Sequence, residues 1–332
     1  MTDLPPIYFY LPQENWRNDM PDKPDIYWEE FGRGIYCWTL QTYLYLKADG
    51  FPCTLVGIMP DEGIVIAHRD SFDYELRPTP KVLMVCIKPD RNPHPYAQLQ
   101  VVQNPQDAKN LKNSYYIPLW RQPGLIPRNP ERGDRFENIG YFGINSNLAP
   151  ELKAASWSKQ LEELGFNWQI IPRNRWYDYS NIDAVVAVRN FQQQDYTQKP
   201  ATKLYNAWHA GVAAILGKES AFQSERKNEF DYFEVSSVED AINFLKYLKD
   251  HPQFYQKVRE NGEYRSHETD PQNTVKQWQK FLIDFAIPKY REWCSASLWR
   301  QQLYLQICYF KIKVDATYNH IYSFLKQEEK QL

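Results

Sequence analysis

The chain has 332 residues, of which 43% are hydrophobic, and its formal net charge at pH 7 is −2. This length exceeds the usual span of one hydrophobic core, so two domains are expected, and the near-neutral charge argues against a general nucleic-acid-binding protein. Five scattered cysteines without a CxxC pair, and six histidines without HxxxH or HExxH spacing, predict reduced thiols and no metal site.

The amino-terminal residues lack the basic and apolar regions of a signal peptide. No apolar stretch approaches the roughly 20 residues that are needed to cross a bilayer. We therefore expect a cytoplasmic protein, with peripheral attachment to the inner face of a membrane as an alternative.

Residues 1–125 alternate short apolar runs with one helical pattern. Apolar residues at roughly helical spacing predict a helix over 31–47. Strands separated by helices of this length are typical of parallel βαβ units, so residues 1–125 are predicted to form a Rossmann-like domain. Its expected strands are 7–10, 51–57, 63–67, 82–87, 98–102 and 114–118.

The segment 121–134 is rich in turn-forming residues. It holds three prolines and two glycines. Such a composition predicts an interdomain linker, which we place at 126–135. An ordinary long surface loop is the alternative.

A second run of strands and helices follows, over residues 136–286. Because the strands are apolar and separated by helices, this range is predicted to form a second Rossmann-like domain, which gives an α/β protein with two such domains. The expected strands are 138–142, 167–171, 182–188 and 212–216, and the expected helices are 150–164, 202–210, 238–250, 252–261 and 271–285.

The last part of the chain, 287–332, is predicted to be helical. It mixes aromatic and aliphatic residues with basic ones. We expect this segment to pack back on the N-terminal domain. The alternative is an amphipathic surface that touches a membrane peripherally.

The most informative segment is 199–222, KPATKLYNAWHAGVAAILGKESAF. Lys199 and Lys203 stand beside the start of a predicted helix, whose free N–H groups favour an anion. Thr202 is the predicted N-cap, and its hydroxyl is also a phosphate ligand candidate. Asn206, one turn later, faces the same side of the helix and is a candidate for ribose or phosphate.

The helix of this segment is followed by an apolar run, which predicts a buried parallel strand. Glu219 and Ser220 then leave the carboxyl end of that strand, where open α/β sheets bind ligands. This arrangement suits a diphosphate at one end and sugar hydroxyls at the other. On spacing alone, an ordinary βαβ unit with lysines near a helix start fits equally well.

The string KPATKLYNAWHAGVAAILG resembles the donor-site segment of bacterial GT-B glycosyltransferases of the group 1, family-4-like type. NIGYFG, which ends at Gly143, is similar to the opening strand and glycine turn of their donor-binding domain. The resemblance implies an N-terminal acceptor-side domain, a C-terminal nucleotide-sugar donor domain, and a cleft between them. The chain departs from the family at Ala213, where proline is usual, and at Gln198 and Asn206, where many retaining members have two glutamates.

Further site residues are predicted around this segment. Arg189 directly follows a buried strand and is the arginine candidate for the diphosphate. Gly34 lies in a loop that looks like the glycine loop facing the donor phosphates. His68 and Asp70 follow another buried strand and are, with Glu219, the predicted catalytic residues. A strand-end histidine without a catalytic role is the alternative for His68.

Asp90 and His94 are two weaker candidates for residues that border the acceptor site. The acceptor itself is left open as a glycan, a lipid-linked molecule or a small molecule. No cofactor and no metal are expected, because the cations would stabilise the departing nucleotide.

The sequence thus predicts a hexosyltransferase-type glycosyltransferase that uses a nucleotide-diphosphate sugar. The alternatives are a nucleotide-sugar epimerase of the same fold and a catalytically inactive partner protein that binds a nucleotide sugar.

Overall fold

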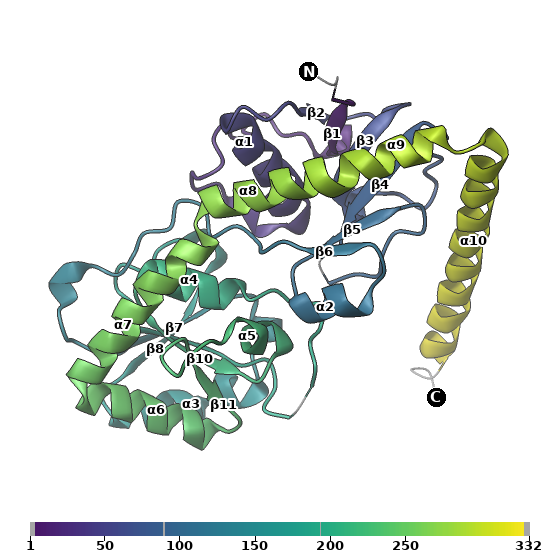
Figure 1. Ribbon diagram of the computed structural model, residues 1–332. Coiled ribbons are helices and arrows are strands. Elements are labelled where there is room, and N and C mark those ends of the chain that lie inside the picture. Colours follow the sequence, from purple (N-terminus) through teal and green to yellow (C-terminus); the bar gives the residue numbers. More distant parts are fainter. Residues whose placement is uncertain (1–3, 89, 193, 329–332) are drawn as a thin grey trace.

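The computed structural model describes residues 4–88, 90–192 and 194–328, with side chains of the last helix described up to residue 314. Two all-parallel sheets form the centres of two α/β domains (Figure 1). This confirms the predicted fold class of two Rossmann-like domains.

The first domain is built on a sheet of order β2-β1-β3-β4-β5-β6. Its central strands are buried along their whole length, as expected for a parallel sheet covered on both faces. The strands are β1 Ile7–Tyr10, β2 Thr54–Val56, β3 Gly63–His68, β4 Val82–Ile87, β5 Leu99–Val102 and β6 Ser114–Tyr116.

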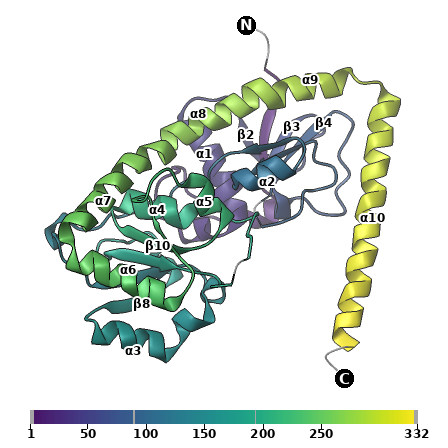
Figure 2. The same cartoon turned by 60° about the horizontal axis from the view of Figure 1, so that its bottom comes forward.

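Alternate side chains of this sheet enter two different cores, because successive residues of a strand point to opposite faces. Ile64 and Ile66 pack with α1 (Gln41–Ala48) and with the π-helical segment Ile35–Leu40 before it. On the same face they pack with α8 (Pro271–Phe281) and α9 (Ile287–Ser295). Val65 and Ala67 face α10 (Leu298–Glu328), which contributes further apolar side chains. Figure 2 shows α8 and α9 crossing one side of the first domain, with α10 descending at its edge. A short helix, α2 (Pro105–Asn110), follows β5.

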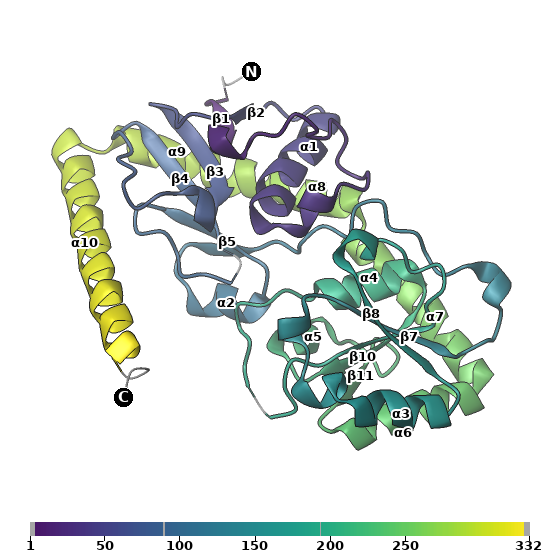
Figure 3. The same cartoon turned by 180° about the vertical axis from the view of Figure 1, so that it is seen from behind.

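The second domain has the strand order β11-β10-β9-β7-β8. Its helices cover both faces of the sheet, and Figure 3 shows the domain from behind. The strands are β7 Asn138–Phe142, β8 Asn167–Ile171, β9 Ala184–Ala187, β10 Ala213–Gly217 and β11 Phe233–Val235. The helices are α3 Ala155–Glu163, α4 Thr202–Ala210, α5 Ser220–Glu225, α6 Val238–Asp250 and α7 Pro252–Ser266.

The turn from α4 into β10 depends on Gly211. This residue ends the helix in the left-handed region, at φ 66°. A residue with a Cβ is strained there, so glycine is favoured. The sequence predicted that the helix ends at this glycine, and the structure confirms it.

The chain after residue 270 belongs to the first domain rather than the second. The sequence grouped 136–286 together, yet Val275, Trp278 and Phe281 of α8 lie in the core of the first sheet. The reason is the apolar face of α8, which packs beside α1 against the same face of the first sheet. The segment 287–332 also contacts the first domain, through Ile287 of α9 and through Cys308 and Ile312 of α10. Side chains after residue 314 and the whole of residues 329–332 lie outside the described part.

The segment 126–135, predicted as a linker, is held against the second domain by buried charges. Arg128 and Arg132 donate hydrogen bonds to the Asp183 carboxylate at 2.7–2.9 Å. Backbone N–H groups of Glu137 and Asn138 donate to the same carboxylate. Burial opposes ionisation of Asp183, but these hydrogen bonds hold its pKa below the ordinary value.

No helix within the described ranges has both the length and the apolar character that a membrane span requires.

Replacing Asp183 by alanine should lower the free energy of unfolding by about 3–5 kcal/mol, because two buried guanidinium groups lose their counter-charge. Chemical denaturation at neutral pH measures this change. The control is Glu137→Ala, which removes an exposed partner of Arg132 and should cost less than about 1 kcal/mol. Equal effects of the two variants would contradict the account of this anchor.

Candidate functional site

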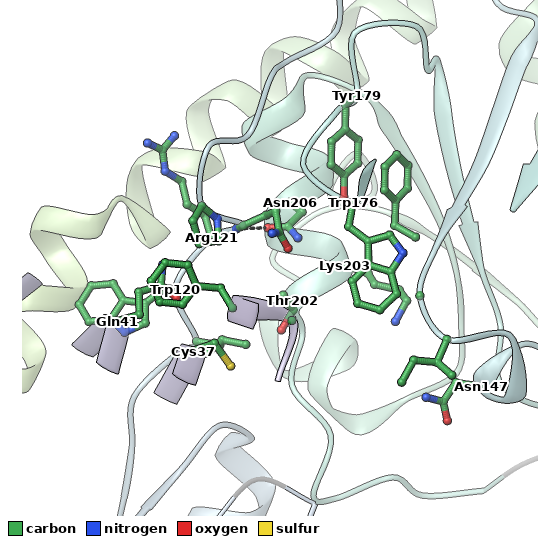
Figure 4. Close-up of a pocket in the computed structure, with 18 residues that line it drawn as sticks. Cys37, Gln41, Trp120, Arg121, Asn147, Trp176, Tyr179, Thr202, Lys203 and Asn206 are labelled. Carbon is green, nitrogen blue, oxygen red and sulfur yellow. Dashed lines mark hydrogen bonds between the residues drawn. The ribbon is translucent and has the colours of Figure 1, made fainter. Parts of the chain in front are cut away.

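A cavity of about 220 Å³ lies where the two domains meet (Figure 4). Its wall combines the segment after β1, the 119–123 connection and the carboxyl-end loops of the second sheet. The lining residues are Phe31, Gly32, Cys37, Gln41, Leu119, Trp120, Arg121, Gln122, Pro123, Phe142, Gly143, Ile144, Asn147, Trp176, Tyr179, Thr202, Lys203 and Asn206. Four of them, Gly143, Thr202, Lys203 and Asn206, are predicted site residues.

The start of α4 is open toward this cavity. Thr202 is the first helical residue and not the N-cap, because Ala201 occupies the N-cap position and no side chain caps the helix. The Thr202 hydroxyl is buried and has no hydrogen-bond partner among the described residues. An uncapped helix start with an unpaired buried hydroxyl is a place where an anion gains hydrogen bonds.

Lys203 brings a desolvated ammonium to the same place. Its pKa is lowered to about 7, first by burial and then by the positive charge of Arg189, while Glu219 acts in the opposite direction. The amine lies 5.7 Å from the centroid of the Tyr141 ring. An anion beside Lys203 would favour its charged form.

Gly143 provides the space that Lys203 occupies. A Cβ at this glycine would stand 2.7 Å from the Tyr141 hydroxyl oxygen and 3.3 Å from the Lys203 Cε. The predicted glycine turn therefore acts here by leaving room for these side chains.

Arg189 and Glu219 form an ion pair next to Lys203. Arg189 follows the β9 region, Glu219 follows β10, and their Nε and Oε2 atoms are 3.1 Å apart. The second guanidinium nitrogen of Arg189, Nη1, is buried without a partner among the described residues. Glu219 is buried and does not line the cavity, so its carboxylate orients Arg189 in this structure.

Lys199 and Ser220 are tied to the first domain. The Lys199 ammonium lies 2.9 Å from an Asp90 carboxylate oxygen. Asn104, the N-cap of α2, donates from its amide nitrogen to the Ser220 hydroxyl at 3.0 Å and to the Lys199 carbonyl at 3.2 Å. These two residues, which were predicted to bind the nucleotide-sugar donor, therefore take part in contacts between the domains.

Asn206 also has a partner that the sequence did not predict. Its side-chain oxygen accepts a hydrogen bond of 2.9 Å from the Gln122 backbone N–H, drawn as a dashed line in Figure 4. This contact fixes the 119–123 connection over the cavity. The predicted ribose contact would therefore use the second lone pair of the amide oxygen or the amide nitrogen.

His68 lies at the end of β3, behind Gly34. A Cβ at Gly34 would be 2.6 Å from the His68 Nε2, so only glycine leaves room for the ring. His68 Nδ1 accepts a 3.1 Å hydrogen bond from the Asp70 N–H, which places the proton of the neutral ring on Nε2. Burial lowers the His68 pKa to about 4. In this arrangement His68 has no free lone pair to act as a base and does not line the cavity.

Asp70 does not line the cavity. It is partly exposed and pairs with Arg91 at 3.1 Å. It lines a second hollow, with Arg69 and Tyr74, on the first domain. His94, the other acceptor-side histidine candidate, is buried among aromatic rings, and burial lowers its pKa to about 4.

An aromatic wall completes the cavity, and sequence reasoning missed it. Phe142 and Tyr179 stack with centroids 3.8 Å apart and planes 7° apart, and Trp176 stands beside them (Figure 4). Phe142 lies inside the NIGYFG motif, and this motif was the one feature of the sequence that could have indicated the aromatic wall. Flat aromatic surfaces of this kind can bind a base or the apolar face of a sugar.

Within the described part of the chain, no group of three or more His, Cys, Asp or Glu side chains is placed to hold a metal ion. The charges around Lys203 are two cations, Lys199 and Arg189, and two carboxylates, Asp90 and Glu219.

Comparison with known proteins finds similarity in structure only. Neither the family models nor the curated proteins match the sequence. The structure of TarM superposes with a TM-score of 0.51 at 6% identity, over 72% of this chain and 58% of TarM. The chain therefore spans less than two thirds of TarM.

A second solved structure, Anabaena HepE in complex with UDP-glucose, has a TM-score of 0.50 at 11% identity. The match covers 85% of this chain and 100% of HepE. At these identities the likeness concerns the fold alone. The chain has the GT-B fold, as the resemblance of its segment 199–222 implied.

Lys203 should lose its proton near pH 7, whereas exposed lysines keep theirs to about pH 10. Arg189→Gln removes a neighbouring positive charge and should raise this pKa, while Glu219→Gln removes a negative charge and should lower it. NMR titration of ¹⁵N-labelled lysine side chains measures the three values. A Lys203 that titrates near pH 10 in all three proteins would overturn the assigned electrostatics.

Proposed function

We propose that this chain is a glycosyltransferase that moves a sugar from a nucleotide-diphosphate donor to an acceptor hydroxyl. The observation that carries the proposal is the set of unsatisfied donors around Lys203: the Thr202 hydroxyl at the start of α4, and Arg189, which follows β9 and is not among the residues that line the cavity. The Thr202 hydroxyl and Arg189 Nη1 are both buried without partners among the described residues, beside the desolvated Lys203 ammonium. A diphosphate supplies the acceptors and the negative charge that these groups lack.

The proposed donor orientation follows from what surrounds these groups. The phosphates would lie against Thr202, Lys203 and Arg189. The base would lie toward the aromatic wall of Phe142, Trp176 and Tyr179, which lines the same cavity. The GT-B fold shared with HepE, which was solved in complex with UDP-glucose, supports a nucleotide-sugar donor.

In the proposed reaction, the bond between the anomeric carbon and the diphosphate oxygen breaks. An acceptor hydroxyl oxygen attacks that carbon and gives up its proton. The leaving nucleoside diphosphate gains negative charge, and Lys203, Arg189 and the open start of α4 would stabilise it. We propose that these cations act without a bound metal ion, as in the sequence-based hypothesis.

The Glu219 carboxylate has a positioning role in this scheme. By holding Arg189 through Nε, it leaves the other guanidinium nitrogens for the diphosphate. His68 is not assigned as the base that accepts the acceptor's proton, because its Nδ1 already accepts a hydrogen bond from the Asp70 N–H.

The first test is donor binding. UDP-, GDP-, ADP- and dTDP-sugars are screened by thermal shift, and one nucleotide class should raise the Tm. Lys203→Met should weaken that binding about tenfold or more, since one charge-assisted phosphate contact is lost. The matched control is Lys218→Met, an exposed lysine beside the site.

A response to none of the four donor classes would refute the donor site. With a binding donor, mass spectrometry of products separates the reactions: release of nucleoside diphosphate with sugar transfer or hydrolysis supports the proposal. Two results would contradict it: recovery of an intact nucleotide sugar whose sugar has been epimerised, or donor binding without any product in the presence of every acceptor tested.

A further inference from the structure

The last helix, α10, has apolar side chains on two opposite faces. On its inner face, Cys308 and Ile312 pack against the first sheet, and the Tyr304 hydroxyl donates to the Tyr96 carbonyl. The Arg77 guanidinium lies 4.5 Å from the centroid of the Tyr309 ring. These contacts fix how the helix is rotated relative to the first domain.

The outer face carries a continuous apolar stripe, which we call the α10 stripe: Trp299, Leu303, Ile307, Phe310 and Val314. The spacing of three and four residues places all five side chains along one side of a helix. They are 47% to 66% exposed. At a rise of 1.5 Å per residue the stripe is about 23 Å long.

The α10 stripe is free of the other domain. In the three views α10 lies at the outer edge of the first domain, away from α3 and α6 (Figures 1–3). Pro95 and Lys311 join Ile307, Phe310 and Val314 around a shallow hollow on this side. A large apolar stripe that is rimmed by polar residues marks an interaction surface.

The charges beside the stripe decide between partners. Between residues 298 and 314 the helix has three basic residues, Arg300, Lys311 and Lys313, and no acidic one. By helical position, Arg300 and Lys311 flank the stripe on one side and Lys313 on the other. A second copy docking stripe to stripe would bring Arg300 and Lys311 of both copies together, which costs free energy, whereas an anionic surface pairs with both of these side chains.

We propose that the α10 stripe docks on an anionic lipid bilayer. The apolar side chains would enter the boundary between headgroups and acyl chains, and Arg300 and Lys311 would contact acidic headgroups. The helix lies flat on the surface in this arrangement, because its inner face stays bound to the first domain. The proposal is independent of donor binding.

Flotation of the full chain with vesicles tests this docking. The protein should float with vesicles of phosphatidylcholine and phosphatidylglycerol, and about tenfold less with phosphatidylcholine alone. High salt should weaken the binding, since the headgroup contacts are ionic.

Two variants separate the parts of the surface. Trp299→Ser/Phe310→Ser and Arg300→Glu/Lys311→Glu should each lower anionic-vesicle binding about tenfold or more. The control is Ile58→Ser/Ile283→Ser, which removes two other exposed apolar side chains and should leave binding unchanged. All these residues are exposed, and unchanged thermal unfolding confirms that the variants fold.

Absence of flotation with the anionic vesicles would overturn the proposal, as would equal loss in the control. Sedimentation velocity supplies the competing outcome. A dimer that Trp299→Ser/Phe310→Ser dissociates would show that a second copy, and not a lipid surface, covers the stripe.

Discussion

The ammonium of Lys203 is the constraint on which the site depends. It lies at the uncapped start of α4, where the helix already presents partial positive charge, and Arg189 adds a full one. Burial removes the water that would otherwise screen these charges, which is why the pKa of Lys203 falls to about 7. Glu219 offsets part of the repulsion but is itself held by Arg189. We propose that an anion completes the arrangement.

The two domains meet through contacts that surround this charged centre. Asn104 caps α2 and reaches Ser220 and the Lys199 carbonyl across the interface. Tyr116 of β6 donates to Glu225 of α5 at 2.5 Å and shares a hydrogen bond with Tyr205 of α4. These contacts attach the donor segment directly to the first domain. Any opening of the cleft must therefore break them, and it would separate Lys199 from Asp90 as well.

Much of this architecture could be predicted from the sequence because it depends on local patterns. The apolar runs of β3, β4, β9 and β10 are long and bounded by turn residues, and Gly211 marks a helix end that requires a positive φ. The start of α4 could also be placed from its local sequence pattern. The resemblance of its segment then implied the donor chemistry, and the fold that it implied is the observed one.

Other features depend on contacts between residues far apart in the chain, and the sequence does not specify these pairs. Nothing local indicates that Asn206 accepts from Gln122, or that Val275 of α8 packs under the first sheet. The surroundings of His68 depend on such contacts as well. Its strand was placed correctly, but its ring faces the backbone at Asp70 and Gly34 and not the cavity.

The account is tested most directly by a crystal structure of the chain with a bound nucleoside diphosphate. We expect phosphate oxygens within about 3 Å of Lys203 Nζ, Arg189 Nη1 and the Thr202 hydroxyl, with the base against Phe142 or Trp176. A diphosphate bound elsewhere, such as the hollow beside Arg69 and Arg91, with the Thr202 and Arg189 atoms still unpaired, would contradict the assignment of the donor site.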